Sequence, residues 1–178
     1  MKQQTHRIIQ SNQLTSLTMA TVLSMGMCGI SQAADDHKLY PGSYCQTTSQ
    51  GYAYDDAIHG SGSISNTSFD HRMIVRCPII RDYSAGNASL KRVRVWFHNN
   101  NTEKTMSCYV STRNADGTYK RLNKSGRSTL GARQGSFTVE YGGDSGTNTF
   151  YTLTCYLPKT VEAFRFPRIK AFKVEEVK

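Results

Sequence analysis

Residues 92–98 read RVRVWFH, and apolar and polar side chains alternate along them. Val93, Val95 and Phe97 share one side of an extended chain, and the residues between them share the other. Side chains of a strand point alternately to the two faces of a sheet, so this period of two predicts a strand with one buried face. The same alternation recurs in residues 73–77, 105–111, 137–139 and 150–157, and less regularly in 169–174.

Turn-forming residues separate these runs. Residues 98–102, 114–117 and 142–148 are rich in Asn, Asp and Gly, and each is predicted to be a short hairpin connection. No run of ten or more residues keeps a helical period, and the best helical candidate is the short segment 160–164. The pattern predicts an all-β protein, an antiparallel β-sandwich of about seven to nine strands with a jelly roll as a variant.

The first residues have the order of a secretory signal peptide. Lys2 and Arg7 precede an apolar run over 14–30, and residues 31–34, SQAA, offer a cleavage site between small residues. The run is interrupted by Thr and Ser and is shorter than the roughly 20 apolar residues that span a bilayer. The sequence therefore predicts a cleaved signal peptide over 1–33, no transmembrane anchor, and a secreted or periplasmic single domain over 34–178.

The predicted mature chain is basic. It keeps 20 of the 22 Lys and Arg and all 13 acidic residues, a formal charge of +7. Such a charge favours anionic partners such as acidic glycans, lipopolysaccharide or nucleic acid, although no specific nucleic-acid motif is present. The alternative is a basic surface without a dedicated partner.

Cysteine usage agrees with export. Cys28 falls in the signal peptide, and Cys45, Cys77, Cys108 and Cys155 remain, an even number typical of disulfides in exported proteins. A metal site does not fit them, because the gaps between them all reach thirty residues or more and no C-x-x-C pair occurs.

The strand phase favours one of the three possible pairings. Cys108 and Cys155 share the inward register of Val110 and Leu153, so both sulfurs are predicted to lie in the core as one disulfide. By elimination, Cys45 is predicted to pair with Cys77.

Five short motifs surround the cysteines and the turns of the predicted mature chain. They are 41–46 (PGSYCQ), 62–68 (GSISNTS), 75–82 (VRCPIIRD), 106–108 (MSC) and 153–158 (LTCYLP). Together they resemble a family of uncharacterised exported bacterial four-cysteine β-sandwich proteins. The resemblance implies a bacterial exported β-domain, and it implies no activity and no site residues.

Catalytic and metal-binding interpretations are weak. Residues 143–146, GDSG, match the nucleophile region of chymotrypsin-like proteases, but no histidine stands in that family's context and the chain is too short for two barrels. Asp55 with Asp56, and Asn114 with Asp116, lack the spacing that a calcium loop needs, and turns explain them. We therefore predict no enzyme, no cofactor and no metal.

Two basic regions are candidates for ligand binding. The first is a predicted mobile loop over 120–133, in which a polyanion could dock through charge alone. It holds no acidic residue, and its cations are Lys120, Arg121, Lys124, Arg127 and Arg133.

The second candidate is the polar side of residues 92–98, where Arg92, Arg94 and Trp96 are predicted to share one face. Arg72 and Arg76 leave the neighbouring apolar run on its own outer face, so the tryptophan is predicted to lie among cations. An exposed indole can stack on a sugar while guanidinium groups bind carboxylate or phosphate. The alternative is that Trp96 is covered by a loop or packs under the arginine side chains.

These observations predict an exported, non-catalytic binding module, with an anionic or carbohydrate ligand of the cell envelope or exterior. An extracellular structural or adhesive subunit is the alternative. A small hydrolase with an unrecognised site ranks last, because no pair of carboxylates, triad or metal cluster occurs at a suitable spacing.

Overall fold

Strands make up most of the residues that the computed structural model describes, which are 36–48, 57–80, 89–114, 116, 118–141 and 149–177. In chain order the strands are β1 (Asp36–Pro41), β2 (Gln46–Thr47), β3 (Ala57–Gly60), β4 (Ser63–Asn66), β5 (Met73–Ile79), β6 (Ser89–His98), β7 (Ser107–Asn114), β8 (Tyr119–Arg127), β9 (Gln134–Glu140), β10 (Thr149–Leu157) and β11 (Arg168–Val177). A 3₁₀ helix, η1 (Gly42–Tyr44), lies between β1 and β2. The best helical candidate of the sequence, segment 160–164, contains a turn and no helix. Within these ranges, no helix has the length and apolar character of a membrane span.

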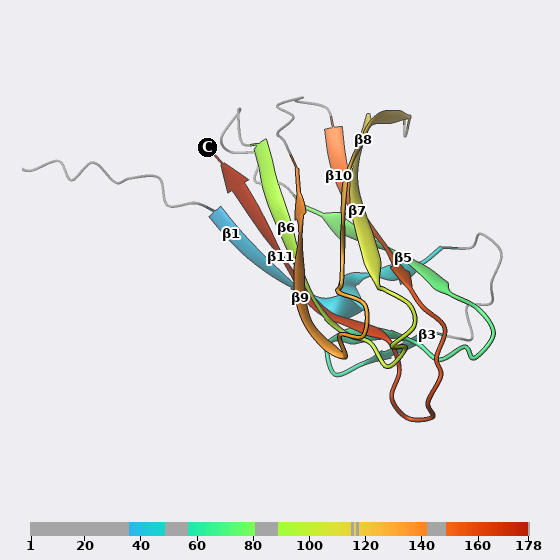
Figure 1. The fold of residues 1–178 in the computed structure, drawn as a ribbon. Coiled ribbons are helices and arrows are strands. Elements are labelled where there is room, and N and C mark those ends of the chain that lie inside the picture. Colours follow the sequence, from blue (N-terminus) through green and yellow to red (C-terminus); the bar gives the residue numbers. More distant parts are fainter. Residues whose placement is uncertain are drawn as a thin grey trace, which may run out of the picture. The chain divides into compact units, whose positions relative to one another are not determined.

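The strands form two antiparallel sheets (Figure 1). Sheet A has the order β3-β4-β11-β6-β9, with β1 also paired to β11, and sheet B has the order β2-β5-β10-β7-β8. The predicted antiparallel β-sandwich is therefore confirmed. It has eleven strands in the described ranges, more than the seven to nine expected, because short edge strands such as β2 and β3 carry little apolar alternation.

Of the three segments predicted to be hairpin connections, one joins neighbouring strands of a sheet and two do not. Residues 114–117 join β7 to β8, which are antiparallel neighbours, so this hairpin is confirmed. The other two were wrong as hairpins: β6 and β9 belong to sheet A, whereas β7 and β10 belong to sheet B. Segment 98–102 therefore starts a crossing between sheets. Segment 142–148 lies outside the described residues but connects strands of different sheets.

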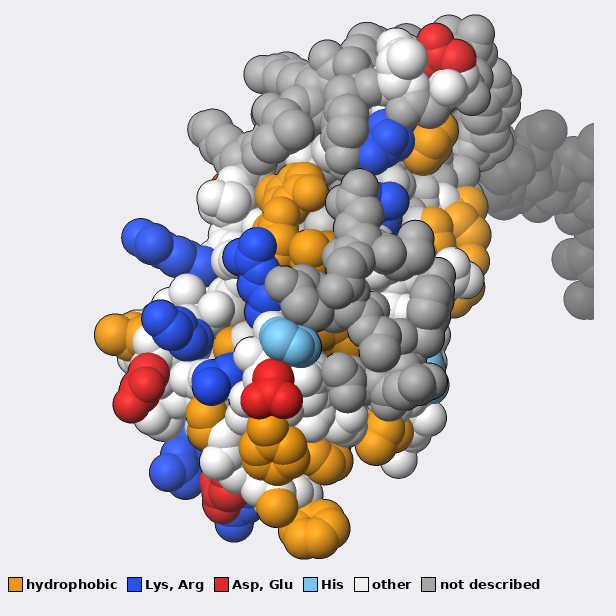
Figure 2. Space-filling view, turned by 90° about the vertical axis from the view of Figure 1, so that its right-hand side faces the viewer, with side chains coloured by type: hydrophobic (Ala, Val, Ile, Leu, Met, Phe, Trp, Pro, Cys, Tyr) orange, Lys and Arg blue, Asp and Glu red, His pale blue; other side chains and the backbone are white. Residues whose placement is uncertain are grey.

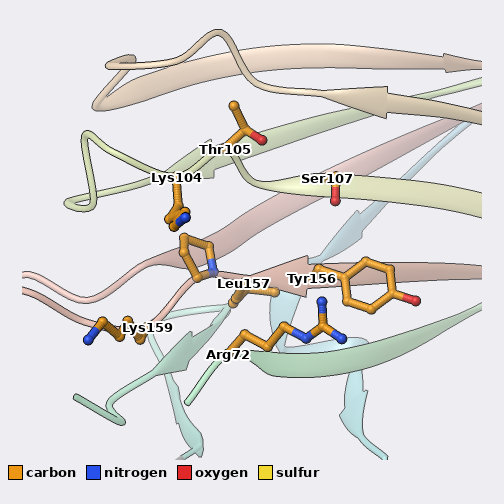
Figure 3. Close-up of a pocket in the computed structure, with 8 residues that line it drawn as sticks. Arg72, Lys104, Thr105, Ser107, Tyr156, Leu157 and Lys159 are labelled. Atoms are coloured by element: carbon orange, nitrogen blue, oxygen red, sulfur yellow. The ribbon is translucent and has the colours of Figure 1, made fainter. Parts of the chain in front are cut away.

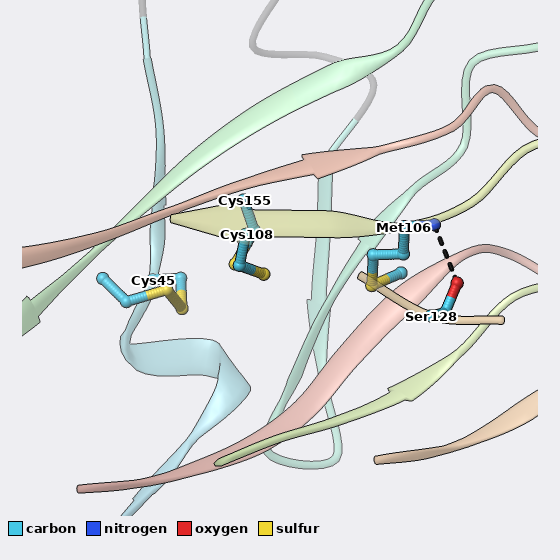
Figure 4. Close-up of a disulfide and its surroundings, with 6 residues drawn as sticks. Cys45, Met106, Cys108, Ser128 and Cys155 are labelled. Carbon is cyan, nitrogen blue, oxygen red and sulfur yellow. Dashed lines mark hydrogen bonds between the residues drawn. A yellow bond between two sulfur atoms is a disulfide. The ribbon is translucent and has the colours of Figure 1, made fainter. Parts of the chain in front are cut away.

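The inward faces of both sheets form one apolar core. On β6, Val93, Val95 and Phe97 are buried, as the alternation predicted. All four cysteines of the predicted mature chain are buried as well, and the structure pairs Cys45 with Cys77 and Cys108 with Cys155 (Figure 4). Both predicted disulfides are confirmed.

The predicted loop over 120–133 is wrong for its first part, since residues 120–127 belong to strand β8. This strand lies at the edge of sheet B and approaches β9 of sheet A, so closely that a Cβ at Gly126 would collide with the Thr138 carbonyl. Its end is fixed to β7, because the Met106 N–H donates to Ser128 Oγ and the Ser128 N–H to the Met106 carbonyl (Figure 4). Pairing on one side and close approach on the other hold this strand without an apolar period.

Candidate functional site

A pocket of about 580 Å³ lies on the outer side of sheet B, where the strands meet the loops at one end of the sandwich (Figure 3). Strands β7 and β10 supply its floor, and the loops after β4, β6 and β10 supply its other side. The lining residues are Arg72, Lys104, Thr105, Ser107, Tyr156, Leu157, Pro158 and Lys159.

Strand pairing sets the floor of the pocket. Alternate residues of β10 are buried in the core, which leaves Tyr156 on the outer face. The register places Tyr156 opposite Ser107 of β7 and opposite Ile74 of β5. The ring therefore lies on the central strand of the five, flanked by short or aliphatic side chains.

Arg72 and two tyrosines form the polar and aromatic part of this face. The Arg72 guanidinium carbon lies 5.1 Å from the centre of the Tyr156 ring, a cation–π distance. Tyr109 lies beside it, with 5.9 Å between the two ring centres. Burial raises the pKa of the Tyr109 hydroxyl, and a hydrogen bond with Tyr156 adds to the rise. The Tyr109 hydroxyl is therefore neutral at physiological pH. The cationic character of the face comes from its basic side chains.

Three buried asparagines hold the walls of the pocket. Asn66 Nδ2 donates to the carbonyls of His71 and Pro158, both at 2.9 Å, and so connects the chain on either side of the opening. Asn99 Nδ2 donates to the Lys104 carbonyl at 2.8 Å, and Asn101 Nδ2 to the Lys159 carbonyl at 3.2 Å. Backbone contacts of this kind fix the two lysines at their base while their side chains stay exposed.

The charge of the pocket is one-sided. Arg72, Lys104 and Lys159 are its basic lining residues, and the lining contains no carboxylate. An aromatic ring with guanidinium and ammonium groups can stack on a sugar while binding carboxylate or sulfate. In the described ranges, no three His, Cys, Asp or Glu side chains gather as a metal site would require. Asp116, which the sequence offered as a calcium ligand, accepts hydrogen bonds from Thr118 as in an ordinary turn. The other residues considered, Asp55, Asp56 and the GDSG segment, lie outside the described residues.

The predicted tryptophan face lies on the opposite sheet. Arg92, Arg94 and Trp96 do share the outer side of β6, and Trp96 is half-buried between Ala171 of β11 and Ser136 of β9. Arg72 and Arg76 are not its neighbours, because both lie on sheet B. Arg76 belongs to β5, and Arg72 directly precedes that strand. The alternation correctly predicted which side chains of each strand face the core. It could not predict to which of the two sheets the strand belongs.

Two cations of this outer face of sheet A, Arg92 and Lys173, lie against one buried carboxylate, Glu175. Arg92 Nε donates to a carboxylate oxygen of Glu175 on β11, and Glu140 of β9 stands opposite Arg92 on its other side. Lys173 Nζ lies 3.6 Å from the second oxygen of Glu175. Burial would raise the pKa of the Glu175 carboxyl, but the hydrogen bond and charge of Arg92 outweigh it, so the pKa lies below its ordinary value.

Four of the five predicted loop cations are distributed along β8, and the fifth, Arg133, follows that strand. The structure describes the backbone of Lys120, Arg121 and Lys124 in this strand, but not their side chains. Arg127 is exposed and stands opposite Ser107, a pocket residue, so it borders the pocket of sheet B. The role of these four cations beside Arg92, Arg94 and Trp96 stays a prediction, since three of the four side chains lie outside the described residues.

Sequence reasoning missed the tyrosines, although a usable signal was present. Tyr109 and Tyr156 each follow a cysteine of the predicted Cys108–Cys155 disulfide. A disulfide between directly paired strands places the next residues on the outer face close together. The structure confirms that Cys108 and Cys155 are directly opposite, with Cα atoms 4.0 Å apart.

The fold is a β-sandwich, and the pocket is a cationic, aromatic opening on sheet B. No family model matches the sequence, and no curated protein matches it. A solved xylan-binding module, CBM15, is similar in structure with a TM-score of 0.50 and 8% sequence identity, over 81% of this chain and 98% of that module. The likeness establishes a shared β-sandwich fold.

Two further structures are similar at lower scores. A family 35 carbohydrate-binding module from Clostridium thermocellum is 9% identical with a TM-score of 0.45, over 78% of this chain and 97% of that module. A family two carbohydrate esterase from Cellvibrio japonicus is 8% identical with a TM-score of 0.44, over 80% of this chain. This chain spans 34% of the esterase.

Proposed function

We propose that this protein is an exported, non-catalytic binding module that holds an acidic polysaccharide in the pocket on sheet B. The observation that carries the proposal is the composition of that pocket, in which three cations and a tyrosine ring converge without a carboxylate. Each uronate or sulfate group would bring one negative charge to a surface that has none of its own.

The two parts of the pocket would have different roles. Tyr156 lies on a central strand, and the Arg72 guanidinium carbon lies over its ring, 5.1 Å from the ring centre. The guanidinium and the exposed part of the ring would contact the sugar together. A guanidinium group can bind a carboxylate through two parallel hydrogen bonds, whereas lysine acts as a point charge. We therefore assign the position of one acidic sugar to Arg72 and Tyr156, and the attraction of the rest of the chain to Lys104 and Lys159.

The covalent structure supports a role outside the cytoplasm. Cys45–Cys77 and Cys108–Cys155 close loops whose ends are 32 and 47 residues apart. Such disulfides persist in oxidising compartments and are rare in the cytosol. The β-sandwich fold shared with a xylan-binding module is compatible with polysaccharide binding, and the pocket chemistry carries the argument for an acidic one.

The test compares two forms of one polymer, polygalacturonate and its methyl ester, by isothermal titration calorimetry. The acidic form should bind more tightly, and its affinity should fall as salt rises, because screening shortens with ionic strength. Arg72→Gln should weaken binding of the acidic form about tenfold, in line with the loss of one charged hydrogen bond. Tyr156→Ala should weaken binding of both forms.

Arg94→Gln is the matched control, since Arg94 is exposed on the outer face of sheet A. It removes the same charge and should change affinity less than about twofold. An equal loss for Arg72→Gln and Arg94→Gln would refute the pocket and leave binding through overall charge. No binding to either polymer would contradict the proposed ligand class.

A further inference from the structure

Exposed apolar side chains gather on the loops at one end of the sandwich. The loop after β4 carries Phe69, the loop after β8 carries Leu130, and the loop after β10 carries Val161 and Phe164. Their exposed fractions are 51%, 63%, 51% and 92%. Figure 2 shows hydrophobic side chains protruding at the lower end of the molecule, with Lys and Arg and some acidic side chains around them.

Hydrogen bonds show that these loops belong to one end. The Thr160 N–H donates to the Ser68 carbonyl at 2.7 Å, which joins the loop after β10 to the loop after β4. The Asn99 N–H donates to the Arg133 carbonyl at 2.7 Å, which joins the loop after β6 to the loop after β8. Asn101 connects the two pairs through Lys159. The four loops therefore form one surface, at the bottom of the view in Figure 1.

Phe164 is held outward by an unfavourable backbone conformation. Its φ is +64°, in the left-handed region that bulky residues rarely adopt. The loop is anchored on both sides of it, at Thr160 through the Asn66 carbonyl and at Pro167 through the Asn66 N–H. A strained residue that exposes a large aromatic ring points to a function in contact with another surface.

Cations surround these apolar tips. Among the residues of the four loops and the start of β11 there are three acids, Asp70, Glu103 and Glu162, the last in an exposed ion pair with Arg165. The same segments hold seven cations, namely Arg72, Lys104, Arg133, Lys159, Arg165, Arg168 and Lys170.

The electrostatic effect of the cations is visible at His98, which closes β6 at this end. Burial lowers the pKa of the His98 imidazole, and the charges of Arg168, Lys170, Arg165 and Arg133 lower it further. The end of the sandwich is thus cationic on the sheet A side as well as on the pocket side.

We infer that this end of the domain docks on an anionic lipid bilayer, with Phe164 and Leu130 entering the interface and the surrounding cations meeting the headgroups. Separate apolar tips within a cationic rim suit the boundary between headgroups and acyl chains. Basic side chains near such a surface each add attraction to anionic lipid. A second copy of this chain fits less well, because it would bring two cationic ends together.

The experiment measures cosedimentation of the full mature domain with two kinds of vesicle, phosphatidylcholine alone and an equal mixture of phosphatidylcholine and phosphatidylglycerol. The protein should bind the anionic vesicles, less as salt rises, and should not bind the neutral ones. Phe164→Ser and Leu130→Ser should each weaken binding by about fivefold or more, because each removes an inserted apolar side chain. Arg133→Gln should weaken it by about fivefold, the equivalent of one cation near an anionic surface.

Leu39→Ser is the matched apolar control, since Leu39 is 67% exposed but lies on β1, away from the four loops. It should leave vesicle binding unchanged, as should Tyr156→Ala, which tests the polysaccharide pocket separately. Failure of the wild-type protein to bind anionic vesicles would overturn the inference. Equal effects of Leu39→Ser and Phe164→Ser on vesicle binding would also overturn it. So would a dimer, seen by sedimentation velocity, that Phe164→Ser abolishes while the wild-type protein does not bind vesicles.

Discussion

The outer faces of both sheets carry arginine and aromatic side chains, but they differ in whether the arginine lies against a carboxylate. On sheet A, Arg92 and Lys173 lie against Glu175, so these two cations are paired within the protein. On sheet B, Arg72 lies against Tyr156, whose ring leaves its charge uncompensated. An arginine beside an aromatic residue in the sequence therefore says little about ligand binding; its neighbours on the adjacent strands decide whether its charge is available.

The faces also differ in how they are supported. Cys77, Cys108 and Cys155 lie on β5, β7 and β10, the three central strands of sheet B, and Cys45 directly precedes β2 of the same sheet. Both disulfides thus lie directly under the surface that carries the pocket. A binding site needs a rigid base, and this sheet has a covalent one.

Removing the disulfides should produce the largest effect and would show how far sheet B depends on them. The double variant Cys108→Ala with Cys155→Ala should lose about 2 to 5 kcal/mol of unfolding free energy, measured by urea denaturation. The loss should exceed that of Cys45→Ala with Cys77→Ala, because the closed loop is longer, with ends 47 rather than 32 residues apart. A larger loss for the Cys45 and Cys77 pair would contradict this ranking.

The matched charges of sheet A predict a smaller, pH-dependent effect. Because the pKa of Glu175 is lowered in the folded protein, its ionised form stabilises the fold above its ordinary pKa of about 4.3, and this contribution is lost as pH falls through the lowered folded value. Glu175→Gln should therefore cost about 1 to 2 kcal/mol at pH 7 and progressively less below pH 4 or so. Thermal unfolding of both proteins across this pH range measures the difference.

Glu103, an exposed carboxylate on the loop after β6, provides the control. Glu103→Gln should change stability little at both pH 7 and pH 3. A Glu175→Gln variant with the same deficit at pH 7 and pH 3 would mean that packing, and not charge, is responsible.

Much of the fold was predictable because the side-chain period records which face of a strand is buried. Val93, Val95 and Phe97 are buried where the alternation of 92–98 placed them. The same phase placed Cys108 and Cys155 in the core and led to the correct disulfides. Each of these predictions needs information about one strand only.

What could not be predicted requires knowledge of the neighbouring strand. The period of 92–98 does not say that Glu175, more than seventy residues away in sequence, pairs with Arg92. Strand β8 has no apolar alternation, because the edge of sheet B and the approach to β9 hold it through the backbone. The pocket also depends on Asn66, Asn99 and Asn101, which look like turn residues in the sequence and are buried in the structure.

The smallest predicted effect concerns those asparagines and tests whether the pocket depends on its loops as well as on its charges. Asn101 donates to the Lys159 carbonyl, whereas its neighbour Asn100 donates to the Glu162 carbonyl, beyond the pocket. Both are nearly buried, so Asn101→Ala and Asn100→Ala should each cost about 1 kcal/mol of stability. Only Asn101→Ala should weaken binding of polygalacturonate, by about threefold, because it releases the base of Lys159 without removing a charge. Calorimetry well below the melting temperature of both variants separates the two effects. Equal affinities would mean that Lys159 binds through long-range attraction alone, and the contrast between the two sheets would then rest on charge and not on the positioning of the loops.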